Sequence, residues 1–547
     1  MVPHSTLLIV IAAAAFKSLL FTAYNSTDFE VHRNWLAVTY STEISEWYTV
    51  ATSKWTLDYP PFFAYFEFLL AQVGNKIDPN MTIVSAEPYA SPATVYFQRI
   101  TVIVSELLLM YSVAKLLTIV FGHSGEEKEP LYLTAITLFA FNFGLFIVDH
   151  VHFQYNGFLF GILFISILRT FQGHYLWSGF WFSILLNFKH VFVYLAPVYF
   201  VFMLYHYCLD RGNNKLPIKI KWNHLLAMGA LICSVFAISI GPFILLGKLP
   251  DLLSRLFPFN RGLCHTYWAP NFWALYNIAD KALSTSGLFP RFCSKGSQEA
   301  LDNQVSMTSG LTGNYQHLCL PTIRPIHTAF LTFAHIIPGL VICTGLKTSP
   351  MDSGFVLVRS IVSAAWASFL FGWHVHEKAV LVITLPLLIL AVVSRRLRGL
   401  CFYVSTIAHF SLLPLIFTPN EQPVMLSFYL LYTLVQYVLL GRSSIPVKDG
   451  LLVKYWRHLT ILGRIHLFGL IPLLFVTRIA LPLLYPRFEF LPLMMTSIYC
   501  AVGLLVSFFI YTWINFSWMW NEKLVKEEEE MEDAYYETKA SFFKKNN

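Results

Sequence analysis

The stretch that decides the fold is the opening one, Thr6-Leu7-Leu8-Ile9-Val10-Ile11-Ala12-Ala13-Ala14-Ala15-Phe16-Lys17-Ser18-Leu19-Leu20-Phe21-Thr22-Ala23-Tyr24, followed by Asn25-Ser26-Thr27-Asp28-Phe29-Glu30. Lys17 is the only charged residue of the run, which is long enough to cross a bilayer core of about 20 residues. It has no basic start and no small-residue cleavage site before Tyr24, so we expect a retained membrane helix. Asp28 then lies at the membrane face, where ionisable groups are costly and usually functional.

Similar apolar runs recur along the whole chain. Of 547 residues, 56% are hydrophobic and 13% are charged, whereas soluble domains carry about 25% charged residues. The runs predict about fourteen membrane spans. They begin near Thr6, Arg99, Leu131, Phe153, His174, Phe192, His224, Ile326, Phe355, Ala379, Leu400, Val424, Ile461 and Leu493. The sequence therefore predicts an all-α polytopic membrane protein with a single transmembrane domain over residues 1–547.

Basic residues indicate the orientation of these spans. The loops 211–221, 395–398 and 442–457 are rich in Lys and Arg, and span counting places them all on the side of both termini. The positive-inside rule makes that side cytosolic. The chain ends in Lys544-Lys545-Asn546-Asn547, which resembles the dilysine signal that cytosolic coat proteins read. We therefore expect a protein of the endoplasmic reticulum membrane with both termini in the cytosol, residues 519–547 as a cytosolic tail, and coat proteins as partners.

Two long segments then face the lumen, residues 25–98 and 248–325. In the first, aromatic residues such as Trp35 and Trp47 alternate with charges, which predicts helices lying in the membrane interface. The second contains Cys264, Cys293 and Cys319, and oxidation is permitted in the lumen. We expect one disulfide among these three cysteines, without deciding the pairing.

Four polar groups fall on the same side as Asp28, at the ends of predicted spans. They are Asp149 to Gly157, Asn187 to His190, the loop with Arg255, Arg261 and His265, and Trp373 to Lys378. A simpler role is open for Asp58, which precedes Pro60-Pro61 and could cap the next helix. His150/His152 and His374/His376 could suggest a metal, but on a helix such pairs point to different faces, so we expect none.

The combination of a carboxylate, cations and aromatic rings at a membrane face suits one kind of substrate, a lipid with a phosphate and a sugar. Lys, Arg and His would hold the phosphate, and aromatic rings would stack on the sugar. The carboxylate would take a proton from an attacking hydroxyl. Because phosphate leaves readily, no general acid is needed. The expected reaction is glycosyl transfer from a lipid phosphate.

Four motifs carry a resemblance to a known family. Thr27-Asp28-Phe29-Glu30, Leu57-Asp58-Tyr59-Pro60-Pro61, His152-Phe153-Gln154-Tyr155-Asn156-Gly157 and Val375-His376-Glu377-Lys378 resemble the endoplasmic reticulum glucosyltransferases that use dolichyl-phosphate-glucose. The likeness runs from Ala23 through the last span. The longer strings Trp47–Phe63, Leu256–His265 and Phe371–Lys378 are most similar to the branch that adds the second glucose.

The resemblance implies a GT-C fold and an inverting transferase. The donor would be dolichyl-phosphate-β-glucose, and the acceptor Glc1Man9GlcNAc2-diphosphodolichol, glucosylated in α-1,3 linkage. It implies Asp28 as the catalytic base, with no metal and no cofactor. The other implied roles are acceptor binding or support of the base by Glu30, Asp58 and Tyr59, donor phosphate binding by His376, Lys378, Arg255, Arg261 and His265, and lining of the cavity by His152, Gln154 and Asn156.

Other functions stay open at this point. The sister enzyme that adds the first glucose to Man9GlcNAc2-diphosphodolichol shares the short motifs. A polytopic transporter would place ionisable residues near the middle of discontinuous spans. A non-catalytic scaffold for other glycosylation enzymes would not need Asp28. The expected partners are membrane lipid, the two lipid-linked substrates and coat proteins, and we expect no nucleic acid.

Overall fold

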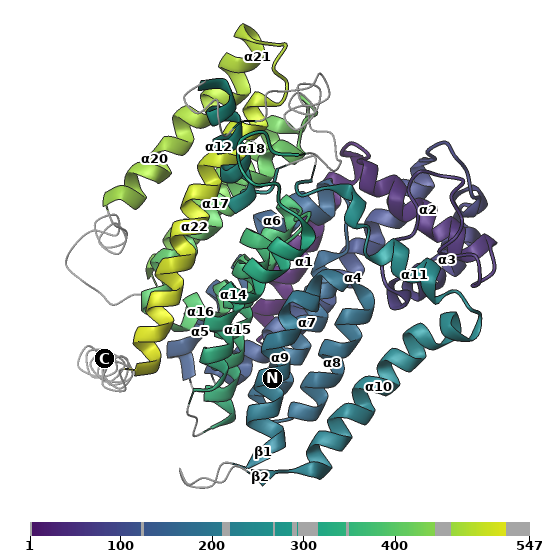
Figure 1. Ribbon diagram of the computed structural model, residues 1–547, viewed down its shortest axis with the longest axis vertical. Coiled ribbons are helices and arrows are strands. Elements are labelled where there is room, and N and C mark those ends of the chain that lie inside the picture. The colour runs from purple at the N-terminus through teal and green to yellow at the C-terminus, as the bar shows by residue number, and fades with distance from the viewer. Residues whose placement is uncertain are drawn as a thin grey trace.

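The computed structural model describes residues 3–121, 125–210, 219–265, 268–286, 293, 316–345, 349–442 and 461–520. Within these ranges the chain is predominantly helical (Figure 1). The strands are limited there to β1 (Leu209–Asp210) and β2 (Lys219–Ile220), which pair antiparallel with Leu209 opposite Ile220. Lys544 and Lys545, predicted as a retrieval signal, lie outside the described residues.

The helices follow one another along the chain, many of them interrupted by short 3₁₀ or π segments. The first half contains α1 (His4–Ser18), η1 (Leu19–Thr22), α2 (Thr27–Ser41), α3 (Pro61–Ile77), η2 (Pro79–Thr82), α4 (Pro92–Phe121), α5 (Gly125–Ala140), α6 (Phe143–Leu145), η3 (Phe146–Val151), α7 (Asn156–Phe171), α8 (Tyr175–Phe188), η4 (His190–Leu195), α9 (Ala196–Met203), η5 (Leu204–Cys208) and α10 (Trp222–Leu245). The second half contains α11 (Leu249–Leu256), η6 (Phe259–Arg261), α12 (Phe272–Ser286), α14 (Pro325–Cys343), α15 (Pro350–Phe371), η7 (Glu377–Val380), α16 (Leu381–Val393), α17 (Arg395–Leu412), η8 (Leu413–Leu415), α18 (Gln422–Arg442), α20 (Ile461–Phe475), η9 (Val476–Ala480), α21 (Leu481–Leu484) and α22 (Leu491–Trp520).

Ten helical stretches in the described ranges are long and apolar enough to cross a membrane. The other four expected spans correspond to α7, α8, α16 and α17, which have 16, 14, 13 and 18 residues. These four are shorter or less apolar than a lipid-exposed span requires. The polytopic all-α architecture is confirmed, whereas the count of fourteen spans is not.

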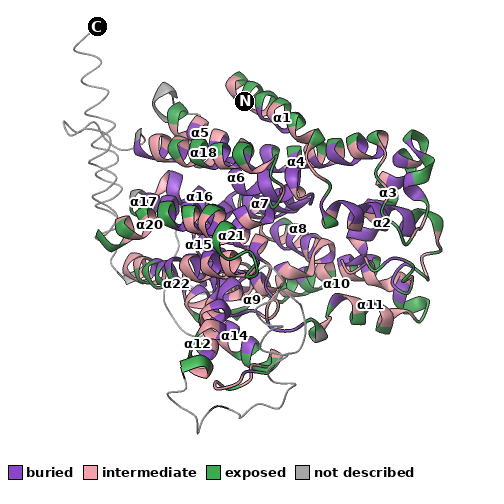
Figure 2. Cartoon of the chain, turned by 90° about the horizontal axis from the view of Figure 1, so that it is seen from above, coloured by how far each residue is buried: buried purple, intermediate pink, exposed green. Residues whose placement is uncertain are grey.

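The core lies around α7 and α16, which are buried on nearly all sides. Buried residues concentrate around α6 and α7 in the interior (Figure 2). Gly157 and Gly161 let α7 approach α4 closely, because a Cβ atom at Gly161 would lie 2.7 Å from the backbone N of Leu109. Small residues four apart commonly allow such contact between membrane helices. This packing fixes the beginning of α7, where Asn156 lies.

Residues 25–98, which are predicted to face the lumen, form a small unit with its own core. α2, α3 and α11 lie together at one edge of the molecule, on the right in Figure 1. Phe29, Trp35, Tyr48 and Phe63 belong to one hydrophobic cluster there. Most residues of α2 are buried (Figure 2), so α2 differs from the expected interfacial helix with one exposed face. The reason is that α3 and the 42–59 connection cover it.

In the second long segment, Cys293 is bonded to Cys319, which confirms the expected disulfide and decides its pairing. Asp280, on α12, holds the end of this loop because its carboxylate accepts from the backbone N of Leu318, Cys319 and Leu320 at 3.0, 2.9 and 2.8 Å.

Candidate active site

Asp28 lies in the first turn of α2, directly after the N-terminal span. Ser26 caps this helix: its Oγ accepts from the backbone N of Phe29 at 3.2 Å and donates to the carbonyl of His152. Such caps stabilise a helix start, and a first-turn carboxylate is favoured by the helix dipole. The cap therefore holds Asp28 where the α1–α2 turn meets the turn that follows η3.

Three residues from two distant motifs surround the Asp28 carboxylate. Its Oδ2 accepts from Lys378 Nζ and from Gln154 Nε2, each at 2.6 Å, and lies 3.4 Å from His152 Nε2. The Asp28 side chain is 19% exposed and that of Lys378 12%. The structure thus brings together Asp28, His152, Gln154 and Lys378, four of the residues predicted from the motifs.

These neighbours set the ionisation of the carboxylate. Burial alone would raise the pKa of Asp28, because it disfavours the charged form. The positive charge of Lys378 and the contact with His152 outweigh burial and hold the pKa of Asp28 well below its usual value. Asp28 is therefore a carboxylate at neutral pH, ready to accept a proton but weakly basic while Lys378 stays bound to it.

A chain of amides continues from Asp28 into the bundle. Asn156 Nδ2 donates to Gln154 Oε1 at 3.2 Å and to Asp149 Oδ1 at 2.9 Å. Asp149 Oδ2 accepts from the backbone N of Gly157 at 2.6 Å. Asp149 was not among the predicted site residues, although it belongs to one of the polar groups at span ends. It orients Asn156, and through it Gln154, toward Asp28.

Lys189 is the second site residue that was not predicted from the motifs. Its Nζ donates to Gln154 Oε1 at 3.2 Å and to Asn156 Oδ1 at 3.1 Å, and lies 4.9 Å from the centre of the Tyr59 ring. Burial, reinforced by the charge of Lys378, lowers the pKa of Lys189 to about 8. The signal in the sequence was its place between two spans, within the Asn187 to His190 polar group.

Two non-glycine residues beside the site have left-handed backbones, Phe153 with φ 74° and His374 with φ 52°. Such conformations cost about 1–3 kcal/mol and persist only where packing imposes them. The fully buried ring of Phe153 packs edge-on against Phe29 at 5.2 Å. This packing keeps His152 and Gln154, on either side of Phe153, directed at Asp28.

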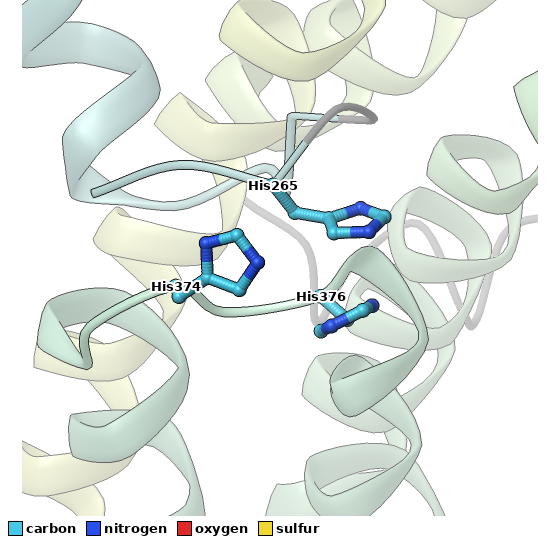
Figure 3. Close-up of side chains that lie close together, drawn as sticks. All are labelled: His265, His374 and His376. Carbon is cyan, nitrogen blue, oxygen red and sulfur yellow. The ribbon is translucent and has the colours of Figure 1, made fainter. Parts of the chain in front are cut away.

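The predicted phosphate ligands His376 and His265 lie close together, beside His374 (Figure 3). The ring centres of His265 and His376 are 3.8 Å apart. His265 Nδ1 lies 3.5 Å from Glu377 Oε2, and His374 Nδ1 lies 3.0 Å from the carbonyl of Gly262. Burial and the neighbouring His265 lower the pKa of His374 to about 4 and that of His376 well below its usual value. His376 is therefore neutral and can offer an N–H to an anion beside Lys378.

His374 and His376 do not lie on a helix, so the prediction of a helix at this pair is wrong. His374 lies in a turn with a left-handed backbone, and Val375 and His376 pair with Cys264 and Trp268 in isolated β-bridges. The rule for side-chain directions on a helix therefore does not apply to these two histidines.

His265, His374 and His376 are consequently the described residues that could hold a metal, with candidate ligand atoms within 4.8 Å of one another. Tetrahedral zinc, with bonds of about 2.1 Å, holds its ligands about 3.4 Å apart and aimed at one centre. The rings of His265 and His376 instead lie nearly face to face, tilted by 31° (Figure 3).

The simpler interpretation, in which Asp58 caps α3, is wrong. Pro60 occupies the cap position without a side-chain bond. Asp58 Oδ2 instead accepts from Arg261 Nη2 at 2.9 Å. Burial raises the pKa of Asp58, and Arg261 offsets only part of that effect. Tyr59 follows directly and lies beneath Lys189, so this predicted pair does border the site.

Two other predicted site residues, Arg255 and Glu30, make contacts that give them structural roles. Arg255 donates to the carbonyl of Tyr48 at 3.1 Å and to Thr56 Oγ1 at 3.0 Å, which ties α11 to the first segment. Glu30 forms an ion pair with Arg33 at 2.5 Å and accepts from the backbone N of Tyr89 at 3.1 Å. These contacts stiffen the support of Asp28, and the direct roles predicted for Arg255 and Glu30 stay predictions.

Comparisons with known proteins extend over almost the whole chain. The chain is 41% identical over 521 residues to the dolichyl pyrophosphate Glc1Man9GlcNAc2 alpha-1,3-glucosyltransferase of Bos taurus, covering 93% of this chain and 94% of that protein. It is 41% identical over 513 residues to the enzyme of that name from Schizosaccharomyces pombe, covering 93% and 97%. It is 43% identical over 502 residues to the probable enzyme of Drosophila melanogaster, covering 91% and 92%.

The family described as "ALG6, ALG8 glycosyltransferase family" matches residues 13–511. That range includes Asp28, Gln154, Lys189 and Lys378, the residues that the tertiary structure gathers. The chain belongs to the ALG6, ALG8 glycosyltransferase family.

Proposed function

We propose that this chain transfers glucose from dolichyl-phosphate-β-glucose to Glc1Man9GlcNAc2-diphosphodolichol, in α-1,3 linkage and with inversion. The names of relatives about 40% identical over more than 90% of the chain support the acceptor and the linkage. The observation that carries the chemistry is the Asp28 carboxylate, held at 2.6 Å by both Lys378 and Gln154 at a junction of membrane spans.

In this mechanism Asp28 takes the proton of the attacking acceptor hydroxyl. The hydroxyl oxygen forms a bond to the anomeric carbon from the face opposite the phosphate. The bond from that carbon to the phosphate oxygen breaks, and its electron pair leaves with dolichyl phosphate. Attack from the opposite face converts the β-linked donor into an α-linked product.

The positive groups serve the leaving phosphate. Lys378 Nζ lies 2.6 Å from Asp28 Oδ2, and His376 precedes Lys378 by two residues. Lys189 supplies a second ammonium group, because its Nζ is held by the same Gln154. Opposite charges placed where negative charge develops lower the barrier in a site shielded from water. No metal and no cofactor takes part.

The ion pair between Lys378 and Asp28 links the two halves of this reaction. While Lys378 binds the carboxylate, Asp28 is a weak base. An incoming phosphate competes for the same ammonium group, and each weakening of the pair raises the basicity of Asp28. Binding of the donor phosphate thereby raises the basicity of Asp28.

The enzyme works in the endoplasmic reticulum membrane with its site on the lumenal side and both termini in the cytosol, where Lys544 and Lys545 bind coat proteins. The position of the basic loops 211–221, 395–398 and 442–457 supports this orientation in the membrane. Analysis of lipid-linked glycans from cells lacking the protein tests the reaction. Accumulation of Glc1Man9GlcNAc2 on dolichol is expected, whereas accumulation of Man9GlcNAc2 would assign the chain to the first glucose instead.

A further inference from the structure

One guanidinium joins the two turns that meet at Asp28. Arg99, on α4, donates through Nη2 to the carbonyls of Ala23 and Tyr24, both at 3.0 Å, and through Nη1 to the carbonyl of His150 at 2.6 Å. Ala23 and Tyr24 lead into the start of α2, whereas His150 lies in η3, just before the turn that carries Gln154. Carbonyls at helix ends have no partner within their own helix, and Arg99 supplies one to both turns.

A second charged residue of α4 joins the same two elements deeper in the bundle. Glu106 Oε2 accepts from Lys17 Nζ of α1 at 2.6 Å and lies 2.8 Å from His150 Nε2 of η3. Lys17 and Glu106 are only 4% and 3% exposed. Arg99 and Glu106 are seven residues apart, which is about two turns, so both project from one face of α4. Ionisable side chains inside spans are costly to keep and usually functional.

The contacts around Asp28 depend on the spacing of these two turns. Asp28 comes from the first turn and Gln154 from the second, and their side chains meet at 2.6 Å. The backbone between Ala23 and Ser26 is not helical, so local hydrogen bonds do not set its distance from η3. Arg99 binds both sides of this junction, and a displacement of about 1 Å between reacting groups can slow an enzyme about 100-fold.

We propose that Arg99 is a positioning residue, which holds the turn bearing Asp28 against the turn bearing Gln154 at the spacing that glucosyl transfer requires. This role rests on the assignment of Asp28 as the base in the proposed function. Arg99 acts through the two turns, and Glu106 supports it by joining α1 to η3.

The test uses the full-length protein in detergent or nanodiscs, with dolichyl-phosphate-glucose and Glc1Man9GlcNAc2-diphosphodolichol. Arg99→Met is expected to lower kcat about 100-fold while the KM for the donor changes less than about threefold. Arg99→Lys, which keeps the charge but not the fork of donors, is expected to recover part of kcat. Arg398→Lys is the matched control, because Arg398 is equally buried at 3% and donates to the carbonyls of Ala391 and Val392 in another part of the bundle.

A double variant that combines the Arg99 change with Asp28→Asn distinguishes a positioning role of Arg99 from a general effect on stability. If Arg99 acts through Asp28, then adding Arg99→Met to Asp28→Asn is expected to slow the enzyme less than threefold further. Full additivity of the two changes would overturn the proposal, and so would a normal kcat in Arg99→Met or an equal loss of kcat in Arg398→Lys. A wild-type rate in Asp28→Asn would overturn the base assignment and this role with it, whereas transfer to Man9GlcNAc2 alone would overturn only the proposed acceptor.

Discussion

Replacing Asp28 with asparagine removes the proposed base while keeping the size of the side chain. The amide cannot accept the proton of the acceptor hydroxyl. General base catalysis contributes about 10²–10⁴-fold, or about 2.7–5.5 kcal/mol of barrier. We therefore expect kcat/KM for glucose transfer to fall by at least about 100-fold in Asp28→Asn.

The same change also removes the negative partner of Lys378. Removing one member of a fully buried ion pair costs about 3–5 kcal/mol, and the cost here is smaller, about 2 kcal/mol, because the two side chains stay 19% and 12% exposed. Natural domains have about 5–15 kcal/mol of stability, so the variant is expected to fold. Freed from Asp28, Lys378 is expected to bind the donor at least as tightly as in the wild type.

The assay measures glucose transfer to the lipid-linked acceptor, together with donor binding and the thermal unfolding temperature. Asp251→Asn is the matched control, because Asp251 forms a half-exposed pair with Lys248 at 3.6 Å, and such surface pairs contribute little. A kcat/KM in Asp28→Asn above about one tenth of the wild-type value would refute the assignment. So would a loss of activity explained entirely by loss of folded protein.

The remaining predictions concern the phosphate ligands, a lysine, the histidine cluster and helix packing. His376→Ala is expected to raise the KM for the donor about tenfold, the effect of losing one charge-assisted hydrogen bond; unchanged donor saturation would exclude His376 from the phosphate site. Activity is expected to fall above about pH 8, because Lys189 loses its charge there. In Lys189→Arg this alkaline limb should disappear, since arginine stays charged, and a limb that persists in a pH–rate profile assigns it to another group. Exhaustive chelation is expected to leave the transfer rate unchanged, and a stoichiometric metal found by elemental analysis would contradict the phosphate role of the histidine cluster. Gly161→Leu is expected to lower the unfolding temperature by forcing α4 and α7 apart, whereas Gly229→Leu, which meets nothing within 4 Å, is expected to leave it unchanged.

Part of the site was visible in the sequence because charge is rare in this chain. Asp28, His152, Gln154 and Lys378 stood out as polar residues at the ends of apolar runs, and the structure brings all four together. Lys189 belonged to one of these polar groups as well, yet nothing in its immediate sequence distinguishes it from an interfacial lysine. Its neighbours Gln154 and Tyr59 come from other segments, so only their meeting reveals its place.

Two local rules fail in this chain because a neighbouring segment decides the geometry. The rule for two histidines separated by one residue assumes a helix at 374–376, whereas His374 lies in a turn and Val375 and His376 pair with Cys264 and Trp268. Asp58 had the position of a helix cap, but the distant Arg261 provides a stronger partner for a carboxylate than the helix end. In both cases a contact remote in sequence outweighed the local preference.

Apolar runs separated by polar ends were enough to determine a polytopic helical protein, because every backbone group in lipid must be bonded within its own helix. The motifs further determined the family and its GT-C fold, which the comparisons confirm. Only the tertiary structure decided which polar groups face Asp28, which cysteines pair, and that Arg99 joins two turns far apart in the chain. The physical reason is that helix formation in a membrane depends on local composition. The partners of a buried charged side chain depend instead on which segments the packing of α4 against α7 brings within hydrogen-bonding distance.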